Sequence, residues 1–350
     1  MKDVLVSDLK GGEILGVPIV SSTDVVLVHS DVVLDAVLIE RIKELGVVSV
    51  LIRDDSFSDK KHFTIEETQE QSKEIVRKVF ERHIYKQTGE LAAIGEQAEK
   101  IVTSVIENPQ VLEEVTEIRK ISTDMYSHCI NVCSLATIMA LRLKMSEHQV
   151  RNVSLGAILH DIGLRYVTVP YMDVDIEHAG GNDALEYKKH TIYGYSAAQA
   201  ESWIPDTVKE IILLHHEREN GSGYPFQQTT DRLRPEVKLV AICDAFDSLI
   251  SGVGGVKMKV YEAIEYLRAY AGVLFDSAIT AKVLASVAMY PVGMKVVTSD
   301  NETGVVFRQN AISDRPVLKM LTKSDGSEYE ANVYKDLMKV LTVFIIDTID

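Results

Sequence analysis

Histidine and aspartate residues lie within or directly after three apolar runs in the middle of the chain. The positions are His160-Asp161, His215-His216 and Asp244. Burial of such polar groups costs free energy unless each finds a partner. A metal ion satisfies both residue types, because neutral imidazole offers a nitrogen and a carboxylate can bridge two ions. This pattern predicts a metal centre.

Two more histidines extend the set, although each alone also fits a structural role. His128 lies on a predicted helix, four residues after Asp124 and on the same helical face, and His190 follows a pair of lysines. Taken in chain order, these residues supply nitrogen and carboxylate ligands for at least two ions. A paired metal site of this kind activates water and stabilises the oxygens of an in-line phosphoryl displacement.

The elements that position these residues are predicted to be mainly helical. The region from about residue 64 to 117 shows an apolar stripe at helical spacing, which is typical of helices with one packed face. Candidate helices in the histidine-rich region span residues 124–143, 146–160, 184–200, 206–217, 235–250, 256–271 and 276–288. The fold class predicted from this pattern is mainly α.

The two ends of the chain show a different pattern. Residues 1–53 contain strand-like runs at 25–28 and 47–52 around a helical stretch, which predicts a small α/β unit. After residue 290, short runs at 295–298, 304–307, 317–321 and 341–346 alternate with turn residues and predict a β-rich segment. The predicted domains are therefore 1–53, a linker and connecting helices over 54–119, a helical domain over 120–290, and 291–350.

Composition narrows the class of protein. The net charge of −15 argues against binding of duplex nucleic acid, which relies on Lys and Arg contacts to phosphates. Cys129, Cys133 and Cys243 form no CxxC pair and are expected to be small core residues in a reducing compartment. No signal peptide or membrane-spanning run is evident, so a cytoplasmic protein that binds no membrane is expected.

The order of these residues resembles the HD-GYP family, a branch of the HD phosphohydrolases. Two strings carry the resemblance: His160 to Gly163 reads His-Asp-Ile-Gly, and the double histidine is followed by Gly223-Tyr224-Pro225. The resemblance covers about residues 120–288 and implies a helical HD-type domain. It implies hydrolysis of cyclic di-GMP, to the linear dinucleotide or to GMP, through a metal-bridging hydroxide.

The resemblance also assigns roles to residues. It implies two or three divalent ions, iron or manganese, held by Asp124, His128, His160, Asp161, His190, His215, His216 and Asp244. Asp161 is the expected bridge between ions, and Asp247 is expected to accept a proton, so both are taken as catalytic. Arg218 and Tyr224 either position the substrate or hold the loop.

Part of the phosphate-binding shell departs from the family. Leu164 stands where the family has a lysine, and the stretch after Asp247 lacks the family's arginine, so Lys257 or Lys259 is the candidate substitute. Asp124 stands where the family often has Glu, which leaves the third ion open. The alternatives are a weakly active nucleotide sensor or protein-interaction adaptor, or a hydrolase of another cyclic dinucleotide. A homodimer and protein partners in signalling also stay open.

Overall fold

The structure is a computed structural model. It describes residues 2–6, 9–11, 13, 15, 18–20, 26–28, 32, 34–47, 49–52, 65–83, 91–108, 122–176, 181–229, 232–330 and 332–349. The chain divides into two compact units, residues 1–62 and 63–350. The predicted linker from 53 to 61 lies outside the described residues. The finer domain boundaries at 53, 119 and 290 stay predictions.

The first unit is a small α/β arrangement, as expected. Strand β1 (Lys2–Leu5) pairs antiparallel with β4 (Ser49–Ile52), and β2 (Ile19–Val20) pairs with β3 (Val26–Val28). Helix α1 (Ala36–Glu44) begins at Asp35, whose carboxylate accepts a hydrogen bond from the Leu38 backbone N–H at 2.8 Å. Leu15, Leu34 and Ile42 are fully buried, so this unit has a core of its own.

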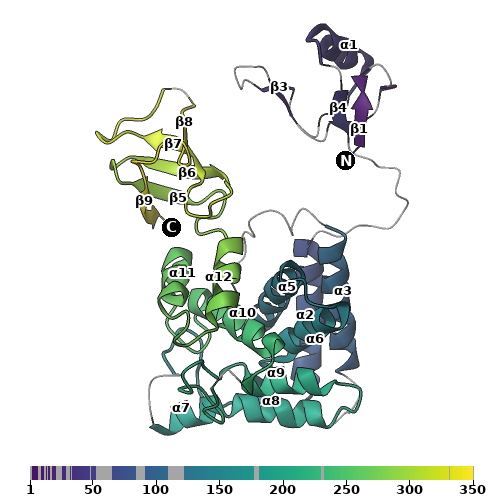
Figure 1. Ribbon diagram of the computed structural model, residues 1–350, viewed down its shortest axis with the longest axis vertical. Helices are drawn as coiled ribbons and strands as arrows, with labels where there is room; N and C mark the ends of the chain where they lie inside the picture. Colours follow the sequence, from purple (N-terminus) through teal and green to yellow (C-terminus); the bar gives the residue numbers. More distant parts are fainter. Residues whose placement is uncertain are drawn as a thin grey trace. The chain divides into compact units, whose positions relative to one another are not determined.

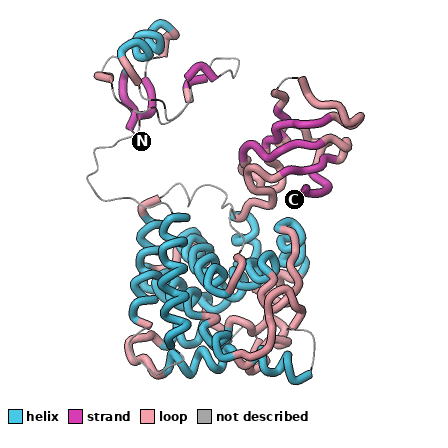
Figure 2. Tube along the Cα trace, turned by 180° about the vertical axis from the view of Figure 1, so that it is seen from behind, coloured by secondary structure: helices cyan, strands magenta, loops and turns pink. Residues whose placement is uncertain are grey.

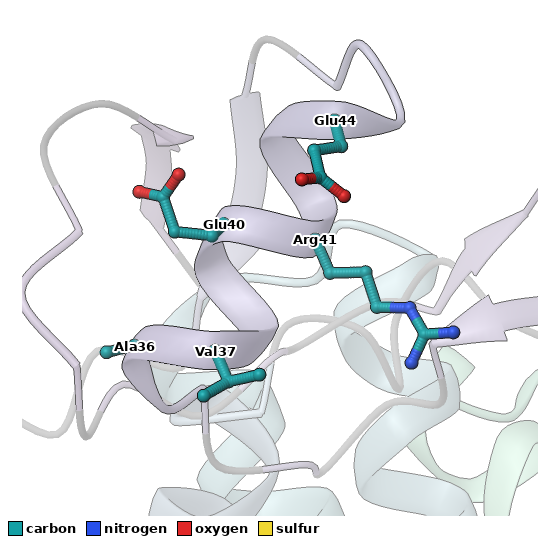
Figure 3. A pocket seen from close by; sticks show the side chains of 5 residues that line it. All are labelled: Ala36, Val37, Glu40, Arg41 and Glu44. Carbon is teal, nitrogen blue, oxygen red and sulfur yellow. The ribbon is translucent and has the colours of Figure 1, made fainter.

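The outer face of α1 borders a shallow hollow. Its lining residues, shown in Figure 3, are Ala36, Val37, Glu40, Arg41 and Glu44. Glu40 pairs with Lys43 at 2.7 Å on this face, and Val37 is exposed. None of the histidines or aspartates of the predicted metal centre lines this hollow.

The second unit is built mainly from helices (Figures 1 and 2). They are α2 (Ile65–His83), α3 (Ala92–Ile106), α5 (Met125–Arg142), α6 (Glu147–Leu159), the short 3₁₀ helix η2 (Ile162–Tyr166), α7 (Gly181–Lys188), α8 (His190–Gln199), α9 (Asp206–Leu214), α10 (Pro235–Ser251), α11 (Val260–Ala269) and α12 (Ser277–Ser286). Helix α5 packs against α6 and α10, and α8 packs against η2 and α9.

Local signals explain where several of these helices begin and end. Ser146 and Gln149 form a capping box at the start of α6. Pro235 occupies the first turn of α10, and Gly252, with φ of +83°, ends it in the left-handed conformation. The single helix expected over 184–200 is instead two helices, α7 and α8, that meet at Lys189.

A five-stranded antiparallel sheet follows the helices. Its strands are β5 (Lys295–Thr298), β6 (Thr303–Arg308), β7 (Val317–Thr322), β8 (Tyr334–Asp336) and β9 (Ile345–Ile349), in the order β8-β7-β6-β5-β9. The strand expected at 341–346 is displaced to 345–349, and β8 was not expected. Val296, Val306 and Leu318 belong to the same buried cluster as the helices, so the sheet shares their core.

These elements confirm the predicted fold class, mainly α with a small α/β unit before the helices and a small β-rich segment after them. None of the described helices is both long and apolar enough to cross a lipid bilayer.

Because residues 1–62 have their own core, we expect their removal to leave the second unit folded. A chain that begins at Thr64 should keep the helical circular-dichroism signal and melt within a few degrees of the corresponding transition of the full chain. Differential scanning calorimetry of both chains makes the comparison. A large fall in melting temperature would show that the first unit stabilises the second.

Candidate metal centre

Five helical segments bring the predicted ligands together. His128 lies in α5, His160-Asp161 follows α6, and His190 begins α8. His215-His216 follows α9, and Asp244 lies in α10. All seven side chains are buried. Among the described residues, three groups have ligand atoms close enough to hold an ion: Asp161 with His190, His215 and His216; His128 with His160 and Asp161; and His160 with His215 and Asp244.

Asp161 occupies the middle of this arrangement. Its Oδ2 atom faces His128 Nε2 at 3.5 Å and His160 Nε2 at 3.4 Å. Its Oδ1 atom faces His190 Nε2 at 3.4 Å and His215 Nε2 at 3.6 Å. Each carboxylate oxygen therefore faces a different pair of imidazoles, which is the placement that a carboxylate bridging two ions requires.

Asp244 completes the half of the centre formed by His128 and His160. Its Oδ1 atom lies 3.2 Å from His128 Nε2 and 3.5 Å from His160 Nε2. Among the described residues, Asp161 Oδ1 and Asp244 Oδ2 are buried and have no hydrogen-bond partner. Such atoms carry a desolvation cost of about 1–3 kcal/mol or more, and bound cations would remove it.

The imidazole tautomers also favour bound cations at this site. The Nδ1 atoms of His160, His190 and His215 face backbone carbonyls of Ala157 (2.7 Å), Tyr187 (2.8 Å) and Ile212 (3.0 Å). Carbonyls only accept, so each Nδ1 carries the hydrogen and the neutral ring keeps a lone pair on Nε2.

These lone pairs converge on one another. His128 Nε2 lies 3.1 Å from His160 Nε2, and His190 Nε2 lies 3.4 Å from His215 Nε2. Two lone pairs at this distance repel unless a proton or a cation lies between them. The residues present therefore fit divalent metal ions.

The pKa values show how the protein balances these charges by itself. Burial alone would lower the pKa of His128, but the Asp244 and Asp247 carboxylates raise it to about 10. Burial lowers the pKa of His190 to about 4, so this ring is neutral at pH 7. Burial would raise the pKa of Asp161, yet the surrounding imidazoles hold it below its usual value. Metal binding would displace the protons on the charged rings.

Asp247 lies behind His128. Its Oδ2 atom accepts a hydrogen bond from His128 Nδ1 at 2.7 Å and another from the Ser122 hydroxyl at 2.7 Å. Asn131 Nδ2 in turn donates to the Ser122 oxygen at 2.8 Å. Asp247 thus orients His128, and its direct role as a proton acceptor stays a prediction. Ser122 was missed because it lies 125 residues from Asp247 in the chain.

The loop after the double histidine is fixed by a buried carboxylate. Glu217 accepts hydrogen bonds from the backbone N–H groups of Phe226 (2.7 Å) and Gln228 (2.9 Å). A Cβ atom at Gly223 would lie 2.3 Å from the His216 carbonyl oxygen, so only glycine allows this close approach. The Tyr224 ring stacks on His216, with centroids 4.6 Å apart.

Arg218 lies in the loop that follows α9 and the double histidine. Its guanidinium donates to the carbonyls of His215 (3.1 Å) and Glu217 (3.2 Å) and lies over the Phe275 ring. It also lies 3.4 Å from His216 Nδ1 and can only donate there, which favours the hydrogen of His216 on Nε2. Arg218 therefore holds the double histidine, and a ligand role of His216 Nε2 requires a different tautomer.

Asp124 is not brought into the cluster. Its Oδ1 atom accepts from the Ser127 backbone N–H at 2.8 Å and caps α5, and its Oδ2 atom pairs with Lys73 Nζ at 2.9 Å. Burial would raise the pKa of Asp124, but these donors lower it. Its role as a metal ligand stays a prediction.

The predicted phosphate-binding positions also have definite surroundings. Leu164 is 1% exposed and belongs to the core, so a lysine there would place its ammonium among apolar side chains. Lys259 Nζ donates to Asp347 Oδ1 (2.9 Å) and to the Thr348 carbonyl (3.1 Å), which ties α11 to β9. Lys257 is exposed in the loop after α10.

Part of the sequence is similar to known proteins. The HD domain family matches residues 92–279. A cyclic di-GMP phosphodiesterase of Pseudomonas aeruginosa is 27% identical over 223 residues, 63% of this chain and 53% of that protein. A cyclic di-GMP phosphodiesterase response regulator of Xanthomonas campestris is 31% identical over 145 residues, 41% of this chain and 38% of that protein. The matched segments therefore span about half or less of these relatives.

A solved structure shows the same fold. It is an HDG"Y"P protein from Bdellovibrio bacteriovorus, with a TM-score of 0.54 and 20% identity, and the match covers 81% of this chain and 98% of that chain. The chain belongs to the HD domain family.

Replacement of Asp161 by Asn tests the bridge. The amide keeps the shape but offers one neutral acceptor in place of two anionic oxygens, so Asp161→Asn should lose most of the bound metal. Loss of an outer partner of a ligand already costs roughly 10–100-fold in affinity, so loss of the ligand should cost at least as much. Metal analysis after dialysis is the measurement. The exposed variant Asp206→Asn is the control, and full metal content in Asp161→Asn would contradict the assignment.

Replacement of Asp124 separates capping from metal binding. Because both carboxylate oxygens are engaged, we expect Asp124→Ala and Asp124→Asn to keep the metal content. Asp124→Ala should lower the free energy of unfolding by about 1 kcal/mol, whereas Asn still caps and should cost less. Denaturant titration and metal analysis measure the two effects. A loss of about one ion in both variants would instead support the third-ion role.

Proposed function

We propose that this chain is a metal-dependent phosphodiesterase that hydrolyses cyclic di-GMP to the linear dinucleotide or GMP. One observation carries the proposal: the two oxygens of buried Asp161 face separate pairs of imidazole Nε2 atoms. This arrangement suits two ions side by side, which is the requirement of in-line phosphoryl displacement. The relatives named as cyclic di-GMP phosphodiesterases support the choice of substrate.

The proposed ligands are His128, His160, Asp161, His190, His215, His216 and Asp244, with iron or manganese as the metal. Asp124 would hold a third ion only if it released Ser127 and Lys73. Bound ions would activate a water molecule and neutralise charge on the phosphoryl oxygens. The protein itself would orient the ligands. Helix-end carbonyls hold the rings of His160, His190 and His215 in the tautomer that leaves Nε2 free to ligate, and Asp247 does the same for His128. The Asp161 carboxylate would join the two halves of the centre.

The residues around the centre support the proposal unequally. The Tyr224 ring stacks on His216, so it borders the proposed metal centre. Arg218 donates to the His215 carbonyl, so its contribution is to hold the loop that carries the double histidine. Lys257 remains a candidate contact to the substrate, since Lys259 is engaged with β9. Asp247 accepts a hydrogen bond from His128. It serves as a proton acceptor in this proposal only if its carboxylate also contacts the water molecule or the substrate.

A nucleotide sensor or adaptor is the second candidate function. It is favoured by Leu164, because this buried leucine supplies no cation at a position where the HD-GYP family has a lysine. Such a protein would keep the metal and bind the nucleotide without turnover.

Turnover with defined metals distinguishes these functions. Protein purified without oxygen and loaded with Mn²⁺ or Fe²⁺ should hydrolyse cyclic di-GMP, with Asp161→Asn reduced to about 1% or less because the bridge is lost. Chromatography of products from cyclic di-GMP, cyclic di-AMP and cyclic GMP-AMP is the measurement. Faster hydrolysis of another dinucleotide would change the substrate, and binding without hydrolysis of any of them would establish the sensor.

A further inference from the structure

Lys188 lies beside the metal centre without belonging to it. It is the last residue of α7, two positions before His190. Its Nζ atom lies over the Tyr224 ring, 5.5 Å from the centroid. That ring stacks on His216 with centroids 4.6 Å apart and an interplanar angle of 17°. The ammonium is therefore separated from an imidazole of the cluster by a single aromatic ring.

No carboxylate among the described residues pairs with this ammonium. Within the described part of the chain, the Lys188 side chain forms no ion pair and no hydrogen bond, although acidic residues outnumber basic ones by 52 to 37. Its neighbour Lys189 differs, because Lys189 Nζ pairs with Glu186 Oε2 at 3.0 Å. The Tyr224 ring attracts the charge of Lys188 but accepts none of its three N–H donors as a phosphate oxygen would. Lys188 is also half-buried.

The other cations near the centre are less suited to a phosphate. Arg218 donates to two backbone carbonyls and packs on Phe275. Lys259 is tied to Asp347 and Thr348 of β9. Lys257 and Arg165 are exposed, and no described contact links either to a ring of the cluster.

A cyclic dinucleotide carries two phosphodiester groups in one small ring. When one group lies at the metal centre, the second stays within the same ring and keeps its negative charge. A cation one aromatic ring away from the centre is placed for this second charge. An ammonium suits the task, since it can turn three donors toward a phosphate oxygen at any angle.

We propose that Lys188 binds the non-scissile phosphodiester of the cyclic dinucleotide and makes the site selective for substrates with two phosphodiesters. This inference rests on the proposed function. It predicts an effect on the binding of the whole dinucleotide and none on the chemistry of a single phosphodiester.

The test compares two substrates and three variants at matched metal loading. The substrates are cyclic di-GMP and bis(4-nitrophenyl) phosphate, which has one phosphodiester and no second charge. Lys188→Met should lower kcat/KM for cyclic di-GMP by about 10–150-fold, mainly through KM, which is the loss of a charge-assisted hydrogen bond. It should leave bis(4-nitrophenyl) phosphate turnover and metal content unchanged. Lys188→Arg should recover most of the loss, and Lys189→Met should show none.

Other outcomes overturn the inference. An equal loss on both substrates, or loss of metal, would show that Lys188 only supports Tyr224 and His216. Full cyclic di-GMP activity in Lys188→Met would also refute it while leaving the proposed function intact. Equilibrium dialysis with cyclic di-GMP separates the remaining case. If the wild type binds without hydrolysis and Lys188→Met binds more weakly, the proposed function fails and the role of Lys188 stands. Equal binding by both would overturn the role as well.

Discussion

The centre depends on hydrogen bonds between imidazole Nδ1 atoms and carbonyls at helix ends. The last carbonyls of a helix have no intrahelical partner. His160, His190 and His215 each follow the end of a helix, α6, α7 and α9, and each ring bonds to a carbonyl of the last turn. The same bond satisfies the helix end and fixes the tautomer. Folding therefore orients three Nε2 lone pairs without a separate side chain to hold each imidazole.

His128 shows why this solution does not serve every ligand. It lies within α5, where the carbonyls of the preceding turn bond to helical N–H groups. Its Nδ1 atom instead uses the carboxylate of Asp247, which Ser122 also holds. Asp244 and Asp247 come from the same face of α10, so one helix supplies a carboxylate to the centre and another to its outer support. This makes α10 the element on which the His128 half of the centre depends.

The sequence predicted the fold class and the members of the cluster because both leave local signals. Apolar residues recur at helical spacing, and His160-Asp161 and His215-His216 interrupt that pattern. The contacts of Ser122 with Asp247 and of Lys188 with Tyr224 leave no such signal, because they join segments distant in sequence. Asp124 shows the opposite difficulty, since an aspartate four residues before a histidine fits a helix cap as well as a ligand. Only the position of Lys73 and Ser127 distinguishes these roles.

Backbone contacts connect the segments that surround the centre with those that carry its proposed ligands. The segment after η2 joins the segment after α10, since the Asp173 N–H donates to the Gly252 carbonyl (2.8 Å) and the Gly254 N–H donates to the Tyr171 carbonyl (2.7 Å). These segments follow the two carboxylates proposed as metal ligands, Asp161 and Asp244, in the chain. A Cβ atom at Gly163 would lie 1.8 Å from the His190 carbonyl oxygen, so η2 and α8 are also in direct backbone contact. A substitution in this framework would therefore move the proposed ligands, whereas the Lys188 side chain contacts the centre through the Tyr224 ring.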